Sequence, residues 1–384
     1  MRNIAIAVIA MAPLAMLACA SPAAAQIALS AGDSKVVLEN GRLRVLADAP
    51  ADIVTILDLA SGRVVGQVAA PHSVVGPPTS VAISADGSLG LVASAQRVDP
   101  AQPTRMIPDN KVSVIDLTAN PPAVVQVAEA GAGASGISIN TAGTLALVAN
   151  RNAGTVSVFR IQAGRLTPLS TVGVGAENSG PSHVQFTPDG RHAMVTRDGD
   201  SMVSVLRVDG EHVRLANREI TAGIRPYGIT ITPDGRWAAV ANIGRGTADA
   251  DTVSLIAIND NRFRVVDTIS VGPTPEGIQF SPDNRHVAVT VMNGSNRPAA
   301  HPLHGRGQLV VLRIEDGRLV RVAQADVGTW GQGVVFNADG TRLFMQNMVE
   351  REIQVLAFDG ARLSDTGTRI AVAGGPAAIR AQGQ

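Results

Sequence analysis

A short turn phrase recurs along this chain at nearly even intervals, and such a repeat confines the chain to a repeat architecture. The phrase reads TPDGR at residues 187–191 and again at residues 232–236. Aligning the chain on this phrase gives seven units, with turns at Asn40-Gly41, Asp86-Gly87, Ala142-Gly143, Asp189-Gly190, Asp234-Gly235, Asp283-Asn284 and Asp339-Gly340. Aspartate or asparagine followed by glycine supplies the positive φ angles of a tight hairpin. We therefore predict that each turn joins the first two strands of a unit.

Two further strands are predicted in every unit. Segments such as NKVSVIDL (110–117) and GTVSVFRI (154–161) alternate apolar and less apolar residues, as half-buried strands do. A short apolar run follows each of them and supplies the fourth strand. Four antiparallel strands repeated seven times predict an all-β fold, a seven-bladed β-propeller whose blades bury their faces against one another. The tail GGPAAIRAQ (374–382) copies the start of a unit. We expect this C-terminal segment to pair into the first blade beside residues 33–69 and to close the ring.

The first 25 residues have the three parts of a secretory signal peptide. Arg2 supplies the positive charge, residues 4–17 form an apolar run, and small residues end at Ala25. We expect cleavage after Ala25, which leaves residues 26–384 as one propeller domain in the periplasm or outside the cell. The single cysteine, Cys19, lies in the signal, so the mature chain has no disulfide. In a second interpretation Cys19 is the lipid-carrying residue of a lipoprotein, but the leucine of such a motif is displaced here by one position.

The overall charge argues against several classes of partner. The chain has 32 basic and 32 acidic residues, and only 3% of its residues are aromatic. It therefore offers no electrostatic attraction for nucleic acid or an anionic membrane, and few rings on which bases could stack. Outside the signal, no stretch approaches the roughly 20 apolar residues that cross a bilayer. We expect no nucleic-acid partner, no membrane span, no cofactor and a monomeric ring.

The repeat continues past the turn in a recognisable way. Its pattern is P-x-G-I-x-[IF]-[ST]-P-D-G-R, followed by VAN and then VSV. Residues 226–255 carry this pattern, with VSL in place of VSV. This pattern resembles the YVTN-type repeat of the lactonase-like β-propeller family and covers nearly the whole mature chain. The resemblance implies the propeller fold and leaves activity open. Related repeats occur in sugar-lactone hydrolases such as 6-phosphogluconolactonases, in cycloisomerases and in proteins without known chemistry.

The resemblance also implies candidate catalytic residues. Enzymes of this kind carry a Gly-Pro-Arg-His phrase, which here reads Gly-Pro-Ser-His and ends at His183. They place a glutamate on the next inner strand, where this chain has Gly228, and an Asn-Arg pair where it has Asn242-Ile243. Arg245 and Glu276 are the nearest residues that would replace the missing groups. In a lactone hydrolase, His183 would act as general base on the attacking water, while arginines hold the anionic group.

The residues themselves indicate a binding face. In a four-stranded antiparallel blade, the second loop lies on the face opposite the first turn, and variable loops on a rigid frame usually carry binding groups. Polar residues that begin the inner strands include Tyr227, Glu276 and Gln332, and nearby arginines that would suit an anion are Arg151, Arg197 and Arg225. Asn242 is either a ligand-binding group or a structural residue that satisfies loop backbone groups.

Two units have a longer second loop than the others, at residues 95–110 and 292–307. Both loops are rich in Pro, Asn and Arg, and we expect them to wall a pocket or to dock a protein partner. His301 and His304 lack a third ligand, so no metal site is predicted. Two hypotheses remain open. The chain is an exported propeller that binds a small anionic ligand or a protein on this loop-bearing face, or it is a lactone hydrolase with His183 as base.

Overall fold

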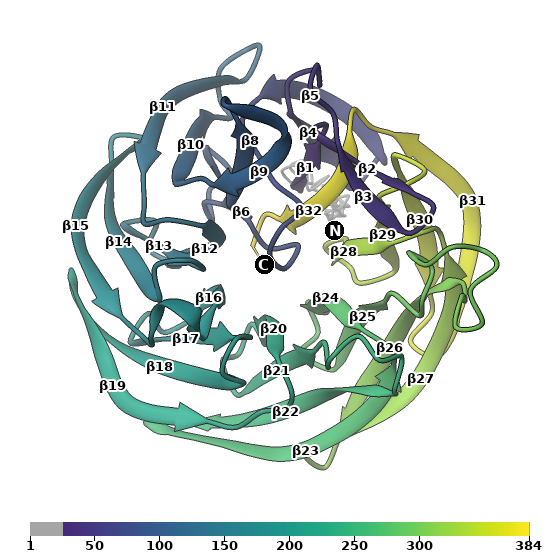
Figure 1. Cartoon of the computed structure of the whole chain (residues 1–384). Helices are drawn as coiled ribbons and strands as arrows, with labels where there is room; N and C mark the ends of the chain where they lie inside the picture. Colours follow the sequence, from purple (N-terminus) through teal and green to yellow (C-terminus); the bar gives the residue numbers. More distant parts are fainter. Residues whose placement is uncertain (1–25, 384) are drawn as a thin grey trace, which may run out of the picture.

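Seven four-stranded antiparallel sheets are arranged as blades in a ring (Figure 1). The computed structural model describes residues 26–383. In each blade the strands run from the centre of the ring outward. The first blade contains β32 (Gly375–Ala381), β1 (Ile27–Asp33), β4 (Ile53–Asp58) and β5 (Arg63–Ala69). The second contains β6 (Val81–Ile83), β7 (Leu89–Ala93), β10 (Lys111–Asp116) and β11 (Ala123–Glu129). The third contains β12 (Ala134–Ile139), β13 (Leu145–Asn150), β14 (Thr155–Gln162) and β15 (Arg165–Gly173).

The remaining blades repeat this order without interruption. The fourth contains β16 (Pro181–Phe186), β17 (His192–Arg197), β18 (Met202–Asp209) and β19 (His212–Ile220). The fifth contains β20 (Pro226–Ile231), β21 (Trp237–Asn242), β22 (Asp251–Asn259) and β23 (Arg262–Gly272). The sixth contains β24 (Pro275–Phe280), β25 (His286–Val291), β26 (Gly307–Glu315) and β27 (Arg318–Val327). The seventh contains β28 (Gly331–Phe336), β29 (Arg342–Asn347), β30 (Glu352–Phe358) and β31 (Leu363–Ala371). The 3-10 helix η1 (Glu177–Ser179) precedes the fourth blade.

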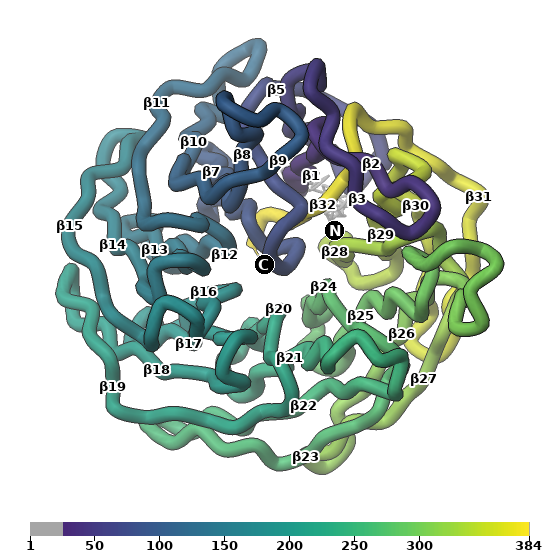
Figure 2. The backbone as a smooth tube through the Cα atoms, viewed as in Figure 1, coloured from purple at the N-terminus to yellow at the C-terminus, as the bar shows by residue number. Residues whose placement is uncertain are grey.

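The C-terminal strand closes the ring, as predicted. β32 pairs antiparallel with β1, with Ala28 opposite Ala381 and Asp33 opposite Gly375. Its partner strand is residues 27–33, just before the range expected from the sequence. Figure 2 shows the C-terminal end of the tube near the centre of the ring. The first blade therefore takes its innermost strand from one end of the chain and its next strand from the other.

The repeated turns use their aspartate differently from the prediction. Five residues, 187–191, connect β16 and β17, and within them only Gly190 has a positive φ, of 69°. The Asp189 carboxylate accepts hydrogen bonds from the Thr187 hydroxyl at 2.6 Å and from the Arg191 backbone N–H at 3.0 Å. The aspartate thus fixes the turn through its side chain, and the threonine that precedes it in the phrase is its partner.

The turn predicted for the first unit does not belong to a blade. Asn40-Gly41 joins an extra hairpin, β2 (Val36–Glu39) and β3 (Arg42–Val45), which is separate from the blades. Because β32 occupies the innermost place of the first blade, the segment between β1 and β4 is free to form this hairpin. Both residues of this dipeptide have a positive φ, of 47° and 75°, whereas in the turn at residues 187–191 only the glycine does. The sequences are alike, which is why the sequence pattern did not distinguish the two kinds of turn.

The two faces of the ring differ. The turn face carries the connections between first and second strands, including residues 187–191. The loop face carries the hairpin β2–β3, the connection 95–110 and the connection 292–306. The 95–110 segment is an ordered hairpin, β8 (Gln96–Asp99) and β9 (Gln102–Pro108), rather than an irregular loop. β3 contacts β9, and Gly41 lies against the ring of Pro298, so the three segments adjoin one another.

The blades pack so closely at the centre that glycine is required on most inner strands. A Cβ atom on Gly136 would lie 2.6 Å from Cα of His183 in the next blade, and one on Gly277 would lie 2.4 Å from the carbonyl oxygen of Gln332. The interfaces between blades are apolar, with fully buried side chains such as Phe280 and Phe336. Burial of each such side chain contributes about 1.5–3 kcal/mol. Among residues 26–383, no helix is long and apolar enough to cross a membrane.

Candidate functional site at the loop-face mouth

The inner strands of several blades begin with polar side chains at the centre of the loop face. They are Ser182, Tyr227, Glu276 and Gln332, each at the second position of its strand. Successive side chains of a strand point to opposite sides. The residue that follows each of them, such as His183 after Ser182, therefore points to the other side of the strand. The sequence predicted this polar set, and the structure brings its members to one mouth.

Asp198 is the centre of the charged contacts at this mouth. It follows β17 and is 3% exposed. One carboxylate oxygen lies 2.8 Å from a guanidinium nitrogen of Arg151 and the other lies 2.9 Å from one of Arg225. The Ser182 hydroxyl donates to the same carboxylate at 2.6 Å. One acidic group therefore holds two arginines from the blades on either side, and a net positive charge remains.

The two arginines differ in their access to solvent. The Arg151 side chain is 18% exposed, donates to the Ser182 hydroxyl at 2.5 Å and lies over the ring of Tyr227 at 5.6 Å. The Arg225 side chain is 42% exposed and keeps further N–H groups for other acceptors. Tyr227 is nearly buried, and burial is the main cause that raises the pKa of its hydroxyl. The phenol is therefore a neutral hydrogen-bonding group at any physiological pH.

Glu276 is the acid with the most perturbed proton affinity at this mouth. Its carboxyl group is half-buried and accepts a hydrogen bond from the Gln332 amide at 3.0 Å. Desolvation raises the pKa of Glu276 to about 8, against the smaller lowering effects of Gln332 and of the Arg225 charge. Near neutral pH this group holds a proton in a large fraction of molecules and can donate or accept it.

Several buried polar atoms around the mouth have no hydrogen-bond partner within residues 26–383. They are Thr79 Oγ1, Ser135 Oγ and Gln332 Oε1, which come from the inner ends of three different blades. Native proteins rarely leave buried polar atoms without partners. These residues occupy corresponding places in the repeat, so the unpartnered atoms recur at one depth of the ring.

His183 does not join this cluster. Its imidazole is fully buried, and Nδ1 accepts a hydrogen bond from the Ile229 backbone N–H at 3.3 Å. Nε2 lies 3.2 Å from a guanidinium nitrogen of Arg380, on the closing strand. Burial, and secondly the Arg380 charge, hold the pKa of His183 well below its usual range. No carboxylate pairs with His183 in the part of the chain that the structure describes, and the contact with Glu276 or Arg245 required for the catalytic hypothesis is not formed.

Three other predicted residues also lie away from the cluster. Arg197 is buried inside the fourth blade, where it pairs with Asp200 at 2.5 Å and with Glu219 at 2.6 Å. Asn242 is 1% exposed, and its amide donates to Thr252 at 3.0 Å and to Ser254 at 3.1 Å. Arg245 is exposed on the loop after β21.

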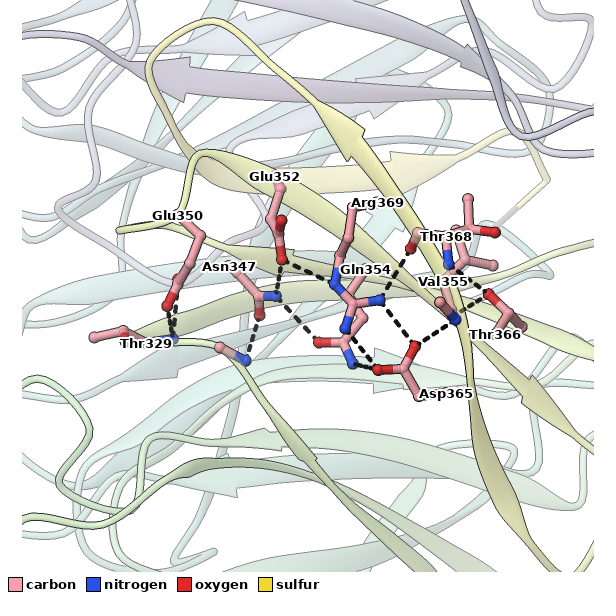
Figure 3. Close-up of polar contacts among 12 residues, drawn as sticks. Thr329, Asn347, Glu350, Glu352, Gln354, Val355, Asp365, Thr366, Thr368 and Arg369 are labelled. Carbon is pink, nitrogen blue, oxygen red and sulfur yellow. Dashed lines mark hydrogen bonds and ion pairs between the residues drawn. The ribbon is translucent and has the colours of Figure 1, made fainter.

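The asparagine at the end of the second strand has a structural role in several blades. In the seventh blade the Asn347 amide donates to Glu352 and Gln354, both at 3.1 Å, and its carbonyl accepts from the Gly328 backbone N–H (Figure 3). Asn242 stands in the equivalent place. The contacts of its amide nitrogen favour the structural interpretation, although its side-chain oxygen, unlike that of Asn347, has no hydrogen-bond partner within residues 26–383.

The two histidines of the loop at residues 292–306 make local contacts with Arg297. His301 Nε2 lies 3.3 Å from a guanidinium nitrogen of Arg297, and His304 Nδ1 lies 3.0 Å from the Arg297 carbonyl oxygen. Among the described residues, no group of three or more His, Cys, Asp or Glu side chains is placed to hold a metal ion.

Sequence reasoning missed Asp198 and Arg380. Asp198 directly follows Arg197, which is the last residue of the second strand of its blade, and no motif marks it. Arg380 lies in the closing segment, which the sequence identified only as structural. Its position in β32 corresponds to that of Gln185 in β16, and this correspondence was the available signal.

Comparisons with known proteins agree with the propeller fold. A family model described as "Lactonase, 7-bladed beta-propeller" matches residues 110–219 and 163–300. No curated protein matches the sequence. Solved structures with the same fold include a putative 6-phosphogluconolactonase from Bacteroides fragilis, at 15% identity and a TM-score of 0.70, over 94% of this chain and 99% of that one. The periplasmic gluconolactonase of Pseudomonas aeruginosa aligns at 18% identity and a TM-score of 0.67, over 93% and 99%.

A third match shows how little the fold says about activity. A functionally unknown protein from Desulfotomaculum acetoxidans aligns at 17% identity and a TM-score of 0.67, over 92% of this chain and 98% of that one. At such identities the likeness establishes the fold alone.

Proposed function

This chain belongs to the lactonase-like seven-bladed β-propeller family, and we propose that it is an exported protein that binds a small anionic, hydroxyl-rich ligand at the loop-face mouth. The observation that carries the proposal is the pairing of two arginines with the single carboxylate of Asp198, beside polar atoms that lack partners. A ligand carboxylate or phosphate would complete the charge balance. Ligand hydroxyls would satisfy the free acceptors and donors around it.

The arrangement also favours a small ligand over a protein. The charged groups lie at the centre of the ring, and the segments β2–β3, β8–β9 and 292–306 stand above that face. Polar groups that converge on a central point from several blades match a compact molecule with hydroxyls on many sides. We therefore assign the long loops to the wall of the site.

Calorimetric titration of the mature protein tests this function. D-gluconate and 6-phosphogluconate are the anionic probes, and D-glucose is the neutral control. We expect Arg151→Ala to weaken binding by tenfold or more, which corresponds to the roughly 1.5–3 kcal/mol of a charged hydrogen bond. Arg245→Ala is the matched control, because this exposed arginine lies outside the cluster. Equal losses in the two variants, or no binding of either anion, would refute the proposal.

Lactone hydrolysis is a second candidate, favoured by the raised pKa of Glu276 and by the names of two structural relatives. In this reaction water attacks the lactone carbonyl, a base takes its proton, and the ring oxygen leaves as a hydroxyl group. The product is a hydroxy acid that releases one proton. The family resemblance assigns the base to His183, whereas the contacts favour Glu276, which is half-buried at the mouth and exchanges a proton near neutral pH.

Proton release at constant pH from glucono-δ-lactone and from 6-phosphogluconolactone measures this activity. We expect Glu276→Gln to abolish turnover and His183→Ala to reduce it less. The opposite order would restore His183 as the base. An absence of turnover in the wild-type protein that still binds gluconate would remove the hydrolase candidate and leave the binding function.

Export is part of the same proposal and rests on the first 25 residues, which lie outside the described structure. Mass spectrometry of the protein recovered from its native host would show a mature chain that begins at Gln26. A chain that retains Met1, or one that begins with a lipidated Cys19, would contradict cleavage after Ala25.

A further inference from the structure

A second cavity lies at the opposite mouth of the ring. It has a volume of about 470 Å³ and is bordered by residues from the turns of successive blades, including Pro188, Pro233 and Pro282. Its lining also includes apolar residues such as Ile139 and Ile231 and the amide side chains of Gln185 and Gln279. Its volume falls within the roughly 300–1,000 Å³ typical of small-molecule sites. No part of the loop-face cluster borders it.

A buried cation lies next to this cavity. Arg380 is 5% exposed, and its guanidinium donates to the side-chain oxygen of Gln279, which itself lines the cavity. Among residues 26–383, no carboxylate lies within 4.0 Å of Arg380, in contrast to Arg151, Arg197 and Arg225. Burying a charge without a counter-charge is costly. The cavity is thus separated by one side chain from an uncompensated positive charge.

The contact between Arg380 and His183 points to a missing acceptor. Nδ1 of His183 accepts the Ile229 backbone N–H, and a neutral imidazole has only one acceptor nitrogen. Nε2 must then carry a hydrogen, and it faces a guanidinium N–H at 3.2 Å. Two donors face each other. An oxygen that accepts from both would remove this conflict and would neutralise the guanidinium.

We propose that the turn-face cavity binds a small organic monocarboxylate, with its carboxylate on Arg380 and its apolar body against Pro188, Pro233 and Pro282. The carboxylate takes the place of the Gln279 oxygen on the guanidinium, and Gln279 turns its amide toward the ligand. A monoanion matches the single cation. The proline and isoleucine residues of the lining suit a hydrocarbon body, and the neighbouring amide side chains can bond to the carboxylate end. This site is independent of the proposed function, because it uses other residues on the other face.

Calorimetric titration with sodium benzoate tests the proposal, with benzyl alcohol as the neutral probe of similar shape. We expect binding of benzoate, at least tenfold weaker binding of the alcohol, and loss of benzoate binding in Arg380→Met. Ala338→Trp keeps the buried residues unchanged and fills the mouth of the cavity, because Ala338 is an exposed residue of its rim. It should also abolish benzoate binding.

Arg151→Ala is the matched control, since it alters the loop face and should leave benzoate binding within twofold. Equal affinity for benzoate and benzyl alcohol would overturn the role of Arg380. Full benzoate binding in Ala338→Trp would place the ligand elsewhere and overturn the site, even if Arg380→Met fails to fold. If the wild-type protein binds benzoate but not gluconate, only the function proposed for the loop-face mouth is refuted.

Discussion

Nε2 of His183 and a guanidinium nitrogen of Arg380 lie 3.2 Å apart, although the two residues belong to the fourth and first blades and are far apart in the sequence. The contact crosses the centre of the ring and places a positive charge beside a fully buried imidazole. The residue with the strongest sequence signal for catalysis is thus fully buried at the centre of the ring, where it contacts a cation and no carboxylate among the described residues.

Replacing His183 with Asn should make the protein less sensitive to acid. The pKa of His183 is lowered in the folded state, so below its unfolded value of about 6.5 the unfolded chain binds more protons and stability falls. The loss approaches about 1.4 kcal/mol per pH unit for one group. Urea unfolding between pH 7 and pH 5 measures it. An identical pH slope in His183→Asn and in the wild type would show that the imidazole is protonated in the folded protein.

Glu276→Gln should remove a loss of stability that the wild-type protein shows as pH rises. The pKa of Glu276 is raised from its ordinary 4.5 to about 8, so the folded state holds a proton that the unfolded state releases. Stability of the wild type therefore falls as pH rises from 4.5 to 8. Because the group is half-buried, we expect roughly 1–2 kcal/mol over this interval. The glutamine variant should lack that slope, and thermal unfolding in a pH series compares the two proteins.

Asp198→Asn should destabilise the protein by about 2–3 kcal/mol, because it leaves two arginines without their shared counter-charge. Asp200→Asn is the matched control. Its carboxylate pairs with Arg197 but is 36% exposed, and Arg197 keeps Glu219, so the expected loss is below about 1 kcal/mol. Denaturant midpoints measure both losses, and equal values would mean that Asp198 is not the centre of the cluster.

Gly136→Ala should cost at least about 3 kcal/mol, because the new Cβ would lie 2.6 Å from Cα of His183, where backbone has to move. Gly173→Ala is the control, since a Cβ there meets nothing within 4 Å. It should leave the free energy of unfolding within about 0.5 kcal/mol. A mild effect at Gly136 would show that neighbouring inner strands can separate.

Much of the fold could be predicted from the sequence, because each blade is a local unit with its own turn and alternating strands. Six of the seven turns and the closing role of the tail follow from patterns within about 50 residues. The first blade was the exception. Asn40-Gly41 has correct turn chemistry and was assigned to the blade, although the tail was expected to close the same blade. The innermost place is taken by β32, so Asn40-Gly41 is left to form a separate hairpin.

The candidate site was less predictable, for a related reason. The polar ring of Tyr227, Glu276 and Gln332 followed from repeat alignment, since equivalent positions lie at equivalent depths. Charge pairing does not follow the repeat. Asp198 recruits Arg151 and Arg225 from two other blades, whereas Arg197 turns into its own blade to meet Glu219. Whether an arginine lies at the mouth depends on which acidic side chain the fold places beside it.

The pairing of β32 with β1 also sets the order in which this molecule can be completed. During synthesis β1 emerges before the other blade strands, and its hydrogen-bonding edge has no partner until residues 375–381 have been made. Blades two to seven each take all four strands from consecutive stretches of chain and can form without the C-terminal segment, whereas the first blade cannot. The ring is therefore complete only when the two ends of the mature chain meet, and until then the edge of β1 that β32 covers is an unpaired strand edge.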